Sequence, residues 1–316
     1  MDQKKVQQII SNYGILIVLI ILFIFFSLTS NNFLRPMNLF NILRQVSIVG
    51  ICAVGMTMVL LTGGIDLSVG SIIGVAGVGA AELMLFNVPP VLSVAIMLLV
   101  SAVIGLLNGF FINKLDVPPL ITTLGMMTSL RGLAYIITGG LPVFGFTSTF
   151  AKLGQGYLWI IPIPVIVMAF IFALGIVLLV KTRFGRYIYG VGGNEEATRL
   201  SGVNIKRVKY LVYGMSGFLS GLSGIILLSR INSGQPKAGQ GYEMDVITAV
   251  VLGGVSISGG EGRLSMVIIG VVIMGVLTNG MIMMNVNDYV QQLVKGLVLI
   301  AAVSFDRYQA RKSIAN

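Results

Sequence analysis

The polar stretch over residues 192–204 carries the clearest local pattern in the chain. Asn194 can cap a helix, because its side-chain oxygen accepts a hydrogen bond from an unpaired amide of the first turn. Glu195 and Glu196 follow where the helix dipole favours negative charge. Gly202 can enter the left-handed conformation that commonly ends a helix. The stretch is therefore predicted to form a short, well-capped helix of about two turns.

Such a helix would act mechanically and would not catalyse a reaction. It is stiff and is tied at both ends to long apolar segments, so it can transmit a push from a soluble partner into whose groove it docks. The alternative is a plain solvated helix between two segments, which needs no partner.

Asp66 and Ser68 belong to a second polar motif, over residues 63–71, which begins with two glycines. A carboxylate beside an apolar segment is costly to dehydrate unless it is paired or hydrated. Capping of the following helix is the simpler interpretation, because Asp and Ser both suit the N-cap position. Direct contact with a solute or an ion is the other interpretation.

Arg131 falls inside an apolar segment and follows Thr122 and Thr123. Ionisable groups at membrane depth mark ion pairs or transport pathways, whereas Arg230 and Lys295, near segment ends, can extend their charges to the interface. Uncharged polar residues inside such segments either join helices or contact a polyhydroxylated solute; they include Asn41, Gln45, Asn108, Asn279 and Gln292. The candidate translocation pathway comprises Asp66, Ser68, Asn108, Thr123, Arg131 and Asn279.

The residue types present argue against chemistry by the chain itself. The sequence has no His, and its one Cys, Cys52, lies in an apolar segment, which argues against a zinc-type site and a His-activated nucleophile. No Gly-rich loop ends in Gly-Lys-Ser/Thr, so ATP binding of that kind is not expected. We expect no catalytic residue, no metal and no cofactor, and a membrane-embedded enzyme is the weakest alternative because no span holds paired carboxylates.

Composition predicts the elements that position these residues. The 316 residues are 56% hydrophobic and 10% charged, whereas a soluble domain carries about 25% charged residues. We therefore expect an all-α polytopic membrane protein, forming one domain over residues 1–316 with about ten spans, some short or broken by glycines. The predicted spans are 14–30, 38–62, 69–87, 91–113, 118–138, 161–180, 208–230, 245–258, 264–284 and 288–305.

Two of these spans, 69–87 and 245–258, border Gly-rich sequence and could be short, broken or re-entrant. Residues 61–70 and 251–260 also resemble each other, since each has a Gly pair after an apolar segment. Such paired interruptions occur in repeat-built transporters, and simple Gly-turn chemistry explains the similarity equally well. The apolar stretch 15–28 is expected to be a retained first span, because no small-residue cleavage site follows it.

Basic residues predict the orientation. The net charge is +10, but the charges lie between apolar segments and form no single basic face, so nucleic acid is not an expected partner. The predicted outer loops hold only Arg35, Lys152 and Lys237, and most other Lys and Arg fall on the opposite side. By the positive-inside rule both termini are then cytoplasmic, as is the polar loop 181–209. The external loop 139–162 carries Trp159, which suits the interfacial aromatic belt.

Blocks of residues in a fixed order identify a family. The chain resembles the sugar-type permeases of bacterial ATP-binding-cassette (ABC) importers over nearly its whole length, and the ribose permeases resemble it most. The resemblance is carried by residues 50–57, 63–71, 131–132, 185–189, 192–202, 235–236, 241–245 and 251–254.

The resemblance implies a pathway formed by two permease chains, either identical or related, in the bacterial inner membrane. It implies a cytosolic ABC ATPase and an extracytoplasmic sugar-binding protein as partners. Residues 194–201 resemble the coupling helix that contacts the ATPase, with Thr198 in place of the second Ala of the family's Glu-Ala-Ala-x-x-x-Gly loop. The implied ATPase-coupling residues are Asn194, Glu195, Glu196, Ala197, Thr198, Arg199 and Gly202.

The resemblance also implies the solute. Ribose is expected, and xylose, galactose, a nucleoside or a furanose such as an autoinducer-2-like signal are the alternatives within the same machinery. A secondary transporter driven by an ion gradient is the more distant alternative, and the small number of carboxylates within predicted spans weighs against it.

Overall fold

A computed structural model describes the backbone over residues 3–146 and 148–315, and side-chain surroundings over 14–146 and 149–307. The described chain is helical except for one hairpin of two short strands. In chain order the elements are α1 Gln3–Thr29, α2 Pro36–Leu61, α3 Val69–Leu85, α4 Pro90–Lys114, α5 Pro119–Thr138, α6 Ser148–Gln155, β1 Tyr157–Leu158, β2 Ile161–Pro162, α7 Ile163–Lys181, α8 Arg183–Gly193, α9 Glu195–Leu200, α10 Ile205–Ile231, α11 Tyr242–Leu252, α12 Leu264–Met283 and α13 Asp288–Ala315.

Seven of the described helices are long and apolar enough to cross a membrane: α2, α4, α5, α7, α10, α12 and the part of α13 up to Arg307. Two shorter apolar helices accompany them, over Gly14–Thr29 within α1 and in α3. The expectation of an all-α polytopic membrane protein with some short segments is thus confirmed.

The span predicted at residues 245–258 is wrong as a full crossing. The helix there, α11, has 11 residues, which gives a length of about 17 Å against a hydrocarbon core of about 30 Å. It ends at Gly253, and Gly254 turns the chain with φ 79°. The apolar residues that follow, Val255 and Ile257, extended the hydropathy pattern beyond the end of the helix.

The long connecting segments hold more structure than expected. The loop 181–209 contains α8 as well as the predicted α9, and the stretch 139–162, which was predicted to be external, contains α6 and the hairpin. In the hairpin, β1 pairs antiparallel with β2 so that Tyr157 faces Pro162. Trp159 is 95% exposed at its tip.

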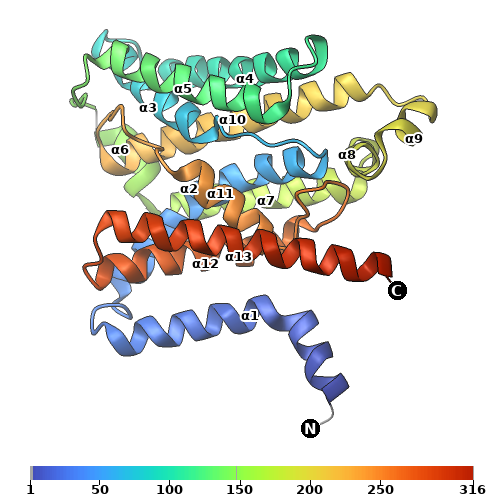
Figure 1. The fold of residues 1–316 in the computed structure, drawn as a ribbon. Coiled ribbons are helices and arrows are strands. Elements are labelled where there is room, and N and C mark those ends of the chain that lie inside the picture. Colours follow the sequence, from blue (N-terminus) through green and yellow to red (C-terminus); the bar gives the residue numbers. More distant parts are fainter. Residues whose placement is uncertain (1–2, 147, 316) are drawn as a thin grey trace.

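The centre of the bundle is formed by α2 and α10. Over the most apolar 18 residues of each helix, 83% of α2 and 78% of α10 is buried, compared with 22% of α5 and 6% of α13. In Figure 1, α4 and α5 lie at one edge and α1 at the opposite edge. The start of α1, the end of α13 and the helix α9 lie at the same end of the bundle (Figure 1).

Glycine allows α10 to pack closely on α4. A Cβ at Gly217 would overlap the carbonyl oxygen of Ser101 and lie 2.9 Å from the Cα of Gly105. Small residues at such crossings let two backbones approach, and van der Waals packing then replaces the hydrophobic driving force that lipid does not provide. The crossing of α4 and α10 is therefore fixed by backbone contact.

Three Gly-rich turns meet at the end of the bundle that carries α9, and we call this the glycine junction. They are the turn after α2 at residues 61–63, the end of α8 at residues 192–193, and residues 259–260 before α12. The amide of Gly260 donates to the carbonyl oxygen of Leu61 at 2.9 Å. The two Gly-paired stretches that resemble each other are therefore in direct contact.

Replacing Gly217 with Val is expected to destabilise the purified chain in detergent, because the added side chain overlaps the α4 backbone. Overpacking of this kind costs about 1–3 kcal/mol, so thermal unfolding should occur several degrees lower. Gly125→Val is the matched control, since no atom lies within 4 Å of a Cβ placed there. Equal unfolding temperatures for the two variants would contradict this packing.

Candidate functional site

Helix α9 has the capping that its sequence predicts. The Asn194 side-chain oxygen accepts from the amide of Ala197 at 2.9 Å. Glu196 pairs with Arg199 at 2.6 Å within the helix. Gly202 follows with φ 82°, the left-handed conformation expected of it.

The exposed surface of α9 is held rigidly from both sides. No residue of α9 is buried, and Leu200 is 79% exposed. Glu195 pairs with Lys209 on α10 at 2.7 Å, and Thr198 packs against Gly190 of α8. The helix is thus a stiff protrusion whose side chains are free to contact another molecule.

Tyr189 ties α8 to the segment that leads from the glycine junction into α12. Its hydroxyl donates to the carbonyl oxygen of Gly262 at 2.9 Å. Burial raises the pKa of Tyr189, and the nearby charge of Arg263 opposes that shift. The phenol therefore stays protonated at neutral pH and keeps donating this hydrogen bond.

Asp66 is fully buried in a polar cluster at the start of α3. One carboxylate oxygen accepts from the amide of Ser68 at 3.0 Å and from its hydroxyl at 2.5 Å, and the other accepts from the hydroxyl of Ser216 at 2.8 Å. Asn108 donates to the Ser68 hydroxyl at 2.9 Å. The cluster therefore joins α3, α4 and α10.

The capping interpretation of Asp66 needs correction. Ser68 occupies the N-cap position of α3 and makes no side-chain capping bond. Asp66 instead accepts from the amide two residues ahead, which is an Asx turn before the helix. The carbonyl oxygen of Ile65, the residue before Asp66, accepts from the hydroxyl of Tyr213 at 3.3 Å and from the hydroxyl of Thr123 at 3.4 Å. Four candidate residues, Asp66, Ser68, Asn108 and Thr123, are therefore close neighbours.

Asn279 lies apart from that cluster. Its side-chain amide and that of Asn38 donate to each other at 2.9 Å in both directions, which joins α12 to α2. Asn38 also donates to the carbonyl oxygen of Phe33 at 2.8 Å. This is the interhelical role that uncharged polar residues usually have in membranes.

Two ion pairs hold the half-length helix α11. Glu243 pairs with Arg131 of α5, and Asp245 pairs with Lys295 of α13 at 2.7 Å. Each carboxylate also has one buried oxygen, Oε2 and Oδ1 respectively, that finds no hydrogen-bond partner within the described part of the chain. Each buried carboxylate therefore depends on its one basic partner.

Sequence reasoning singled out Arg131 but missed its partner Glu243, and it interpreted Lys295 as a side chain that extends to the interface, whereas Lys295 pairs with Asp245. The available signal was that two carboxylates begin the apolar stretch of α11 while basic residues, Arg131 and Lys295 among them, lie in other apolar segments. Charges at membrane depth pair with one another, so the sequence indicates ion pairs of α11 without specifying which basic residue each carboxylate contacts.

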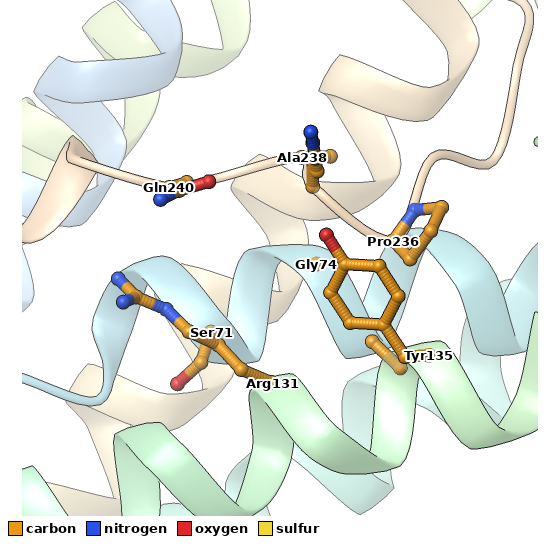
Figure 2. A pocket seen from close by; sticks show the side chains of 9 residues that line it. Ser71, Gly74, Arg131, Tyr135, Pro236, Ala238 and Gln240 are labelled. Carbon is orange, nitrogen blue, oxygen red and sulfur yellow. The ribbon is translucent and has the colours of Figure 1, made fainter. Parts of the chain in front are cut away.

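A cavity of about 120 Å³ lies beside Arg131. Its walls come from α3, from α5 and from the connection 232–241 between α10 and α11, which passes so close to α3 that a Cβ at Gly74 would lie 2.7 Å from the carbonyl oxygen of Ala238. Figure 2 shows the side chains of Arg131, Tyr135 and Gln240 around this space. Of the six predicted pathway residues, Arg131 lines this cavity and the other five do not.

Comparisons with known proteins place this geometry in context. Residues 38–303 match the family described as branched-chain amino acid transport system / permease component. The chain is 44% identical to the ribose import permease protein RbsC of Bacillus subtilis, over 97% of this chain and 96% of the relative. It is 46% identical to RbsC of Escherichia coli K12, over 92% of each.

A relative that is named for a different sugar is nearly as similar to the chain. The L-arabinose transport system permease protein AraH of Escherichia coli K12 is 42% identical, over 95% of this chain and 91% of the relative. No solved structure matches the chain.

Removing Lys295 alone is expected to destabilise the chain more than removing the whole pair. Lys295→Met leaves the buried carboxylate of Asp245 without its partner, which costs about 3–5 kcal/mol for a buried pair. The double variant Asp245→Asn/Lys295→Met should recover most of that loss. Calorimetric unfolding in detergent measures both, and a double variant no more stable than the single one would contradict the pairing. Glu196→Gln, in an exposed pair, should change stability by less than about 1 kcal/mol.

Proposed function

The chain belongs to the permease family of bacterial ABC importers that its match over residues 38–303 defines, and we propose that the solute it carries is ribose. The observation that supports ribose most directly is the identity of 43–46% with ribose import permeases of three bacterial genera along nearly the whole chain. The chain is a permease subunit and not itself an enzyme. The family description names branched-chain amino acids, but the similar relatives reported above are named for sugars.

Arabinose is the second candidate solute. The arabinose permeases are 40–42% identical, which is only slightly below the ribose permeases. Both solutes are pentoses of the same formula, so a pathway with few polar contacts would separate them poorly. In an importer with a binding protein, that protein can make the choice.

The partners we propose are a cytosolic ABC ATPase, an extracytoplasmic sugar-binding protein and a second permease chain. The contact with the ATPase is α9, because it is exposed, rigid and capped at both ends. Closure of the ATPase upon ATP binding would move α9, and the α8 contacts with the glycine junction would carry that movement to α2 and α12. The spans would then alternate between outward and inward openings.

Among the pathway candidates, we propose that Arg131 contacts the solute. It is 32% exposed and lines the cavity of Figure 2. The other five candidates are buried and bonded to neighbouring helices, so we assign them to holding the helices that border the pathway. They are Asp66, Ser68, Asn108, Thr123 and Asn279.

We propose that both termini and the loop 181–209 are cytoplasmic. The positive-inside pattern and the position of α9 at the same end of the bundle as the start of α1 and the end of α13 support this orientation (Figure 1). In spheroplasts of a Cys52→Ser strain, a membrane-impermeant maleimide should label Trp159→Cys and should label Glu195→Cys only after permeabilisation. Labelling of Glu195→Cys from outside would reverse the topology.

Substitution of α9 tests the coupling. In the reconstituted complex, Glu196→Ala and Gly202→Ala should each lower binding-protein-stimulated ATP hydrolysis and ribose uptake by about tenfold, a usual size for coupling between sites. Lys114→Ala is the control, since Lys114 is exposed on the same predicted side but lies outside α9 and the glycine junction. If both α9 variants kept normal uptake and stimulated hydrolysis, the coupling assignment would fail.

A further inference from the structure

We propose that the cavity beside Arg131 is a pentose-binding site of the permease itself, in which Arg131, Tyr135 and Gln240 donate and accept hydrogen bonds with sugar hydroxyls. This inference rests on the proposed function, because it concerns the same solute. It adds that the permease recognises the sugar and does not merely provide an opening. Tyr135 and Gln240 were not among the residues that the sequence singled out, whereas Ser71 belongs to the motif 63–71.

The size of the cavity fits a five-carbon sugar. The volume is about 120 Å³, and a water molecule needs about 10–15 Å³ of such space. The cavity therefore accommodates on the order of ten water-sized groups, and a pentose has about ten non-hydrogen atoms. A disaccharide would not fit without movement of the walls.

The polar groups converge from three separate elements. Ser71 comes from α3, Arg131 and Tyr135 come from α5, and Gln240 comes from the connection 232–241. Donors and acceptors that are few, fixed in place and supported by apolar surroundings are what orient a small ligand in a pocket. Only 10% of the residues are charged, and packing of apolar helices does not require polar groups to converge on one cavity.

The charge of Arg131 does not call for an anionic solute, and the other basic residue of the lining, Lys237, is exposed. The positive charge of Arg131 is already balanced by the buried carboxylate of Glu243. A guanidinium has five N–H donors, and its ion pair with Glu243 uses one amino group, so donors remain for hydroxyl oxygens. The hydroxyl of Ser71 donates to the carbonyl oxygen of Ser68 at 2.8 Å, which leaves its oxygen lone pairs as acceptors for a sugar hydroxyl.

The position of the cavity suits the first contact with an arriving sugar. Arg131 lies seven residues before the end of α5 at Thr138, or about 10 Å along the helix, and that end is predicted to be external. The connection that forms the other wall is also predicted to be external. Hydrogen bonds contribute about 0.5–1.5 kcal/mol each between neutral groups and about 1.5–3 kcal/mol to a charged group such as Arg131, so three or four of them hold a sugar weakly enough to release it onward.

Direct binding tests the site apart from transport. Saturation-transfer NMR on the purified permease in nanodiscs, with millimolar D-ribose as the probe, should show transfer to the sugar. Gln240→Ala and Tyr135→Phe should each reduce that transfer by about fivefold, the effect of losing one hydrogen bond of ordinary strength. Ala238→Leu, which fills the cavity, should abolish it. Tyr157→Phe is the matched control, because it removes a tyrosine hydroxyl from the exposed hairpin.

Uptake by the full complex separates the outcomes. If the unaltered complex hydrolyses ATP but takes up neither ribose nor arabinose, the proposed solute is wrong. If it takes up ribose while Gln240→Ala, Tyr135→Phe and Ala238→Leu bind and transport ribose normally, the cavity is not a sugar site. The expected result is reduced ribose uptake and a changed ratio of ribose to arabinose uptake, with binding-protein-stimulated ATP hydrolysis retained. A loss of hydrolysis and uptake together in all three variants would indicate a structural role and overturn the inference.

Discussion

The architecture depends on how charge is neutralised where water is scarce. Among the residues whose side-chain surroundings are described, three carboxylates are buried in the apolar bundle: Asp66, Glu243 and Asp245. The first is surrounded by hydroxyl and amide donors, and the other two are each matched to one basic side chain from another helix. An unpaired charge in such surroundings is costly, so these contacts fix which helices are neighbours. The segment 62–68 and the helix α11, neither of which crosses the membrane alone, are held in place by them.

Close backbone packing provides the remaining rigidity. Lipid tails are as apolar as the side chains of the spans, so burial of apolar surface gives little preference for one helix partner over another. Contacts of glycine with neighbouring backbones give that preference, at the α4–α10 crossing and at the glycine junction. Helices α2 and α10 are central because, taken together, they contact most of the other helices.

The features that could be predicted from the sequence were local ones. The long spans follow from runs of apolar residues, and α9 follows from Asn194, its two glutamates and Gly202, since capping depends on residues a few positions apart. The length of α11 was missed because the hydropathy of residues 253–258 does not record the turn at Gly254. The pairing of Arg131 with Glu243 joins residues 112 positions apart, and no local pattern specifies such a contact.

The half-length helix α11 links two distant regions of the bundle. The first turn of α11 carries Glu243, which pairs with Arg131, and Arg131 lines the cavity. The segment after its last turn runs to Gly259 and Gly260 at the glycine junction, which the end of α8 also joins. Helix α9 follows α8 directly. One 11-residue helix thus connects the cavity beside α5 to the end of the bundle that carries α9. In the mechanism proposed above, a tilt of this one helix would couple binding in the cavity to movement of the end of the bundle that carries α9, without any rearrangement of the full-length spans.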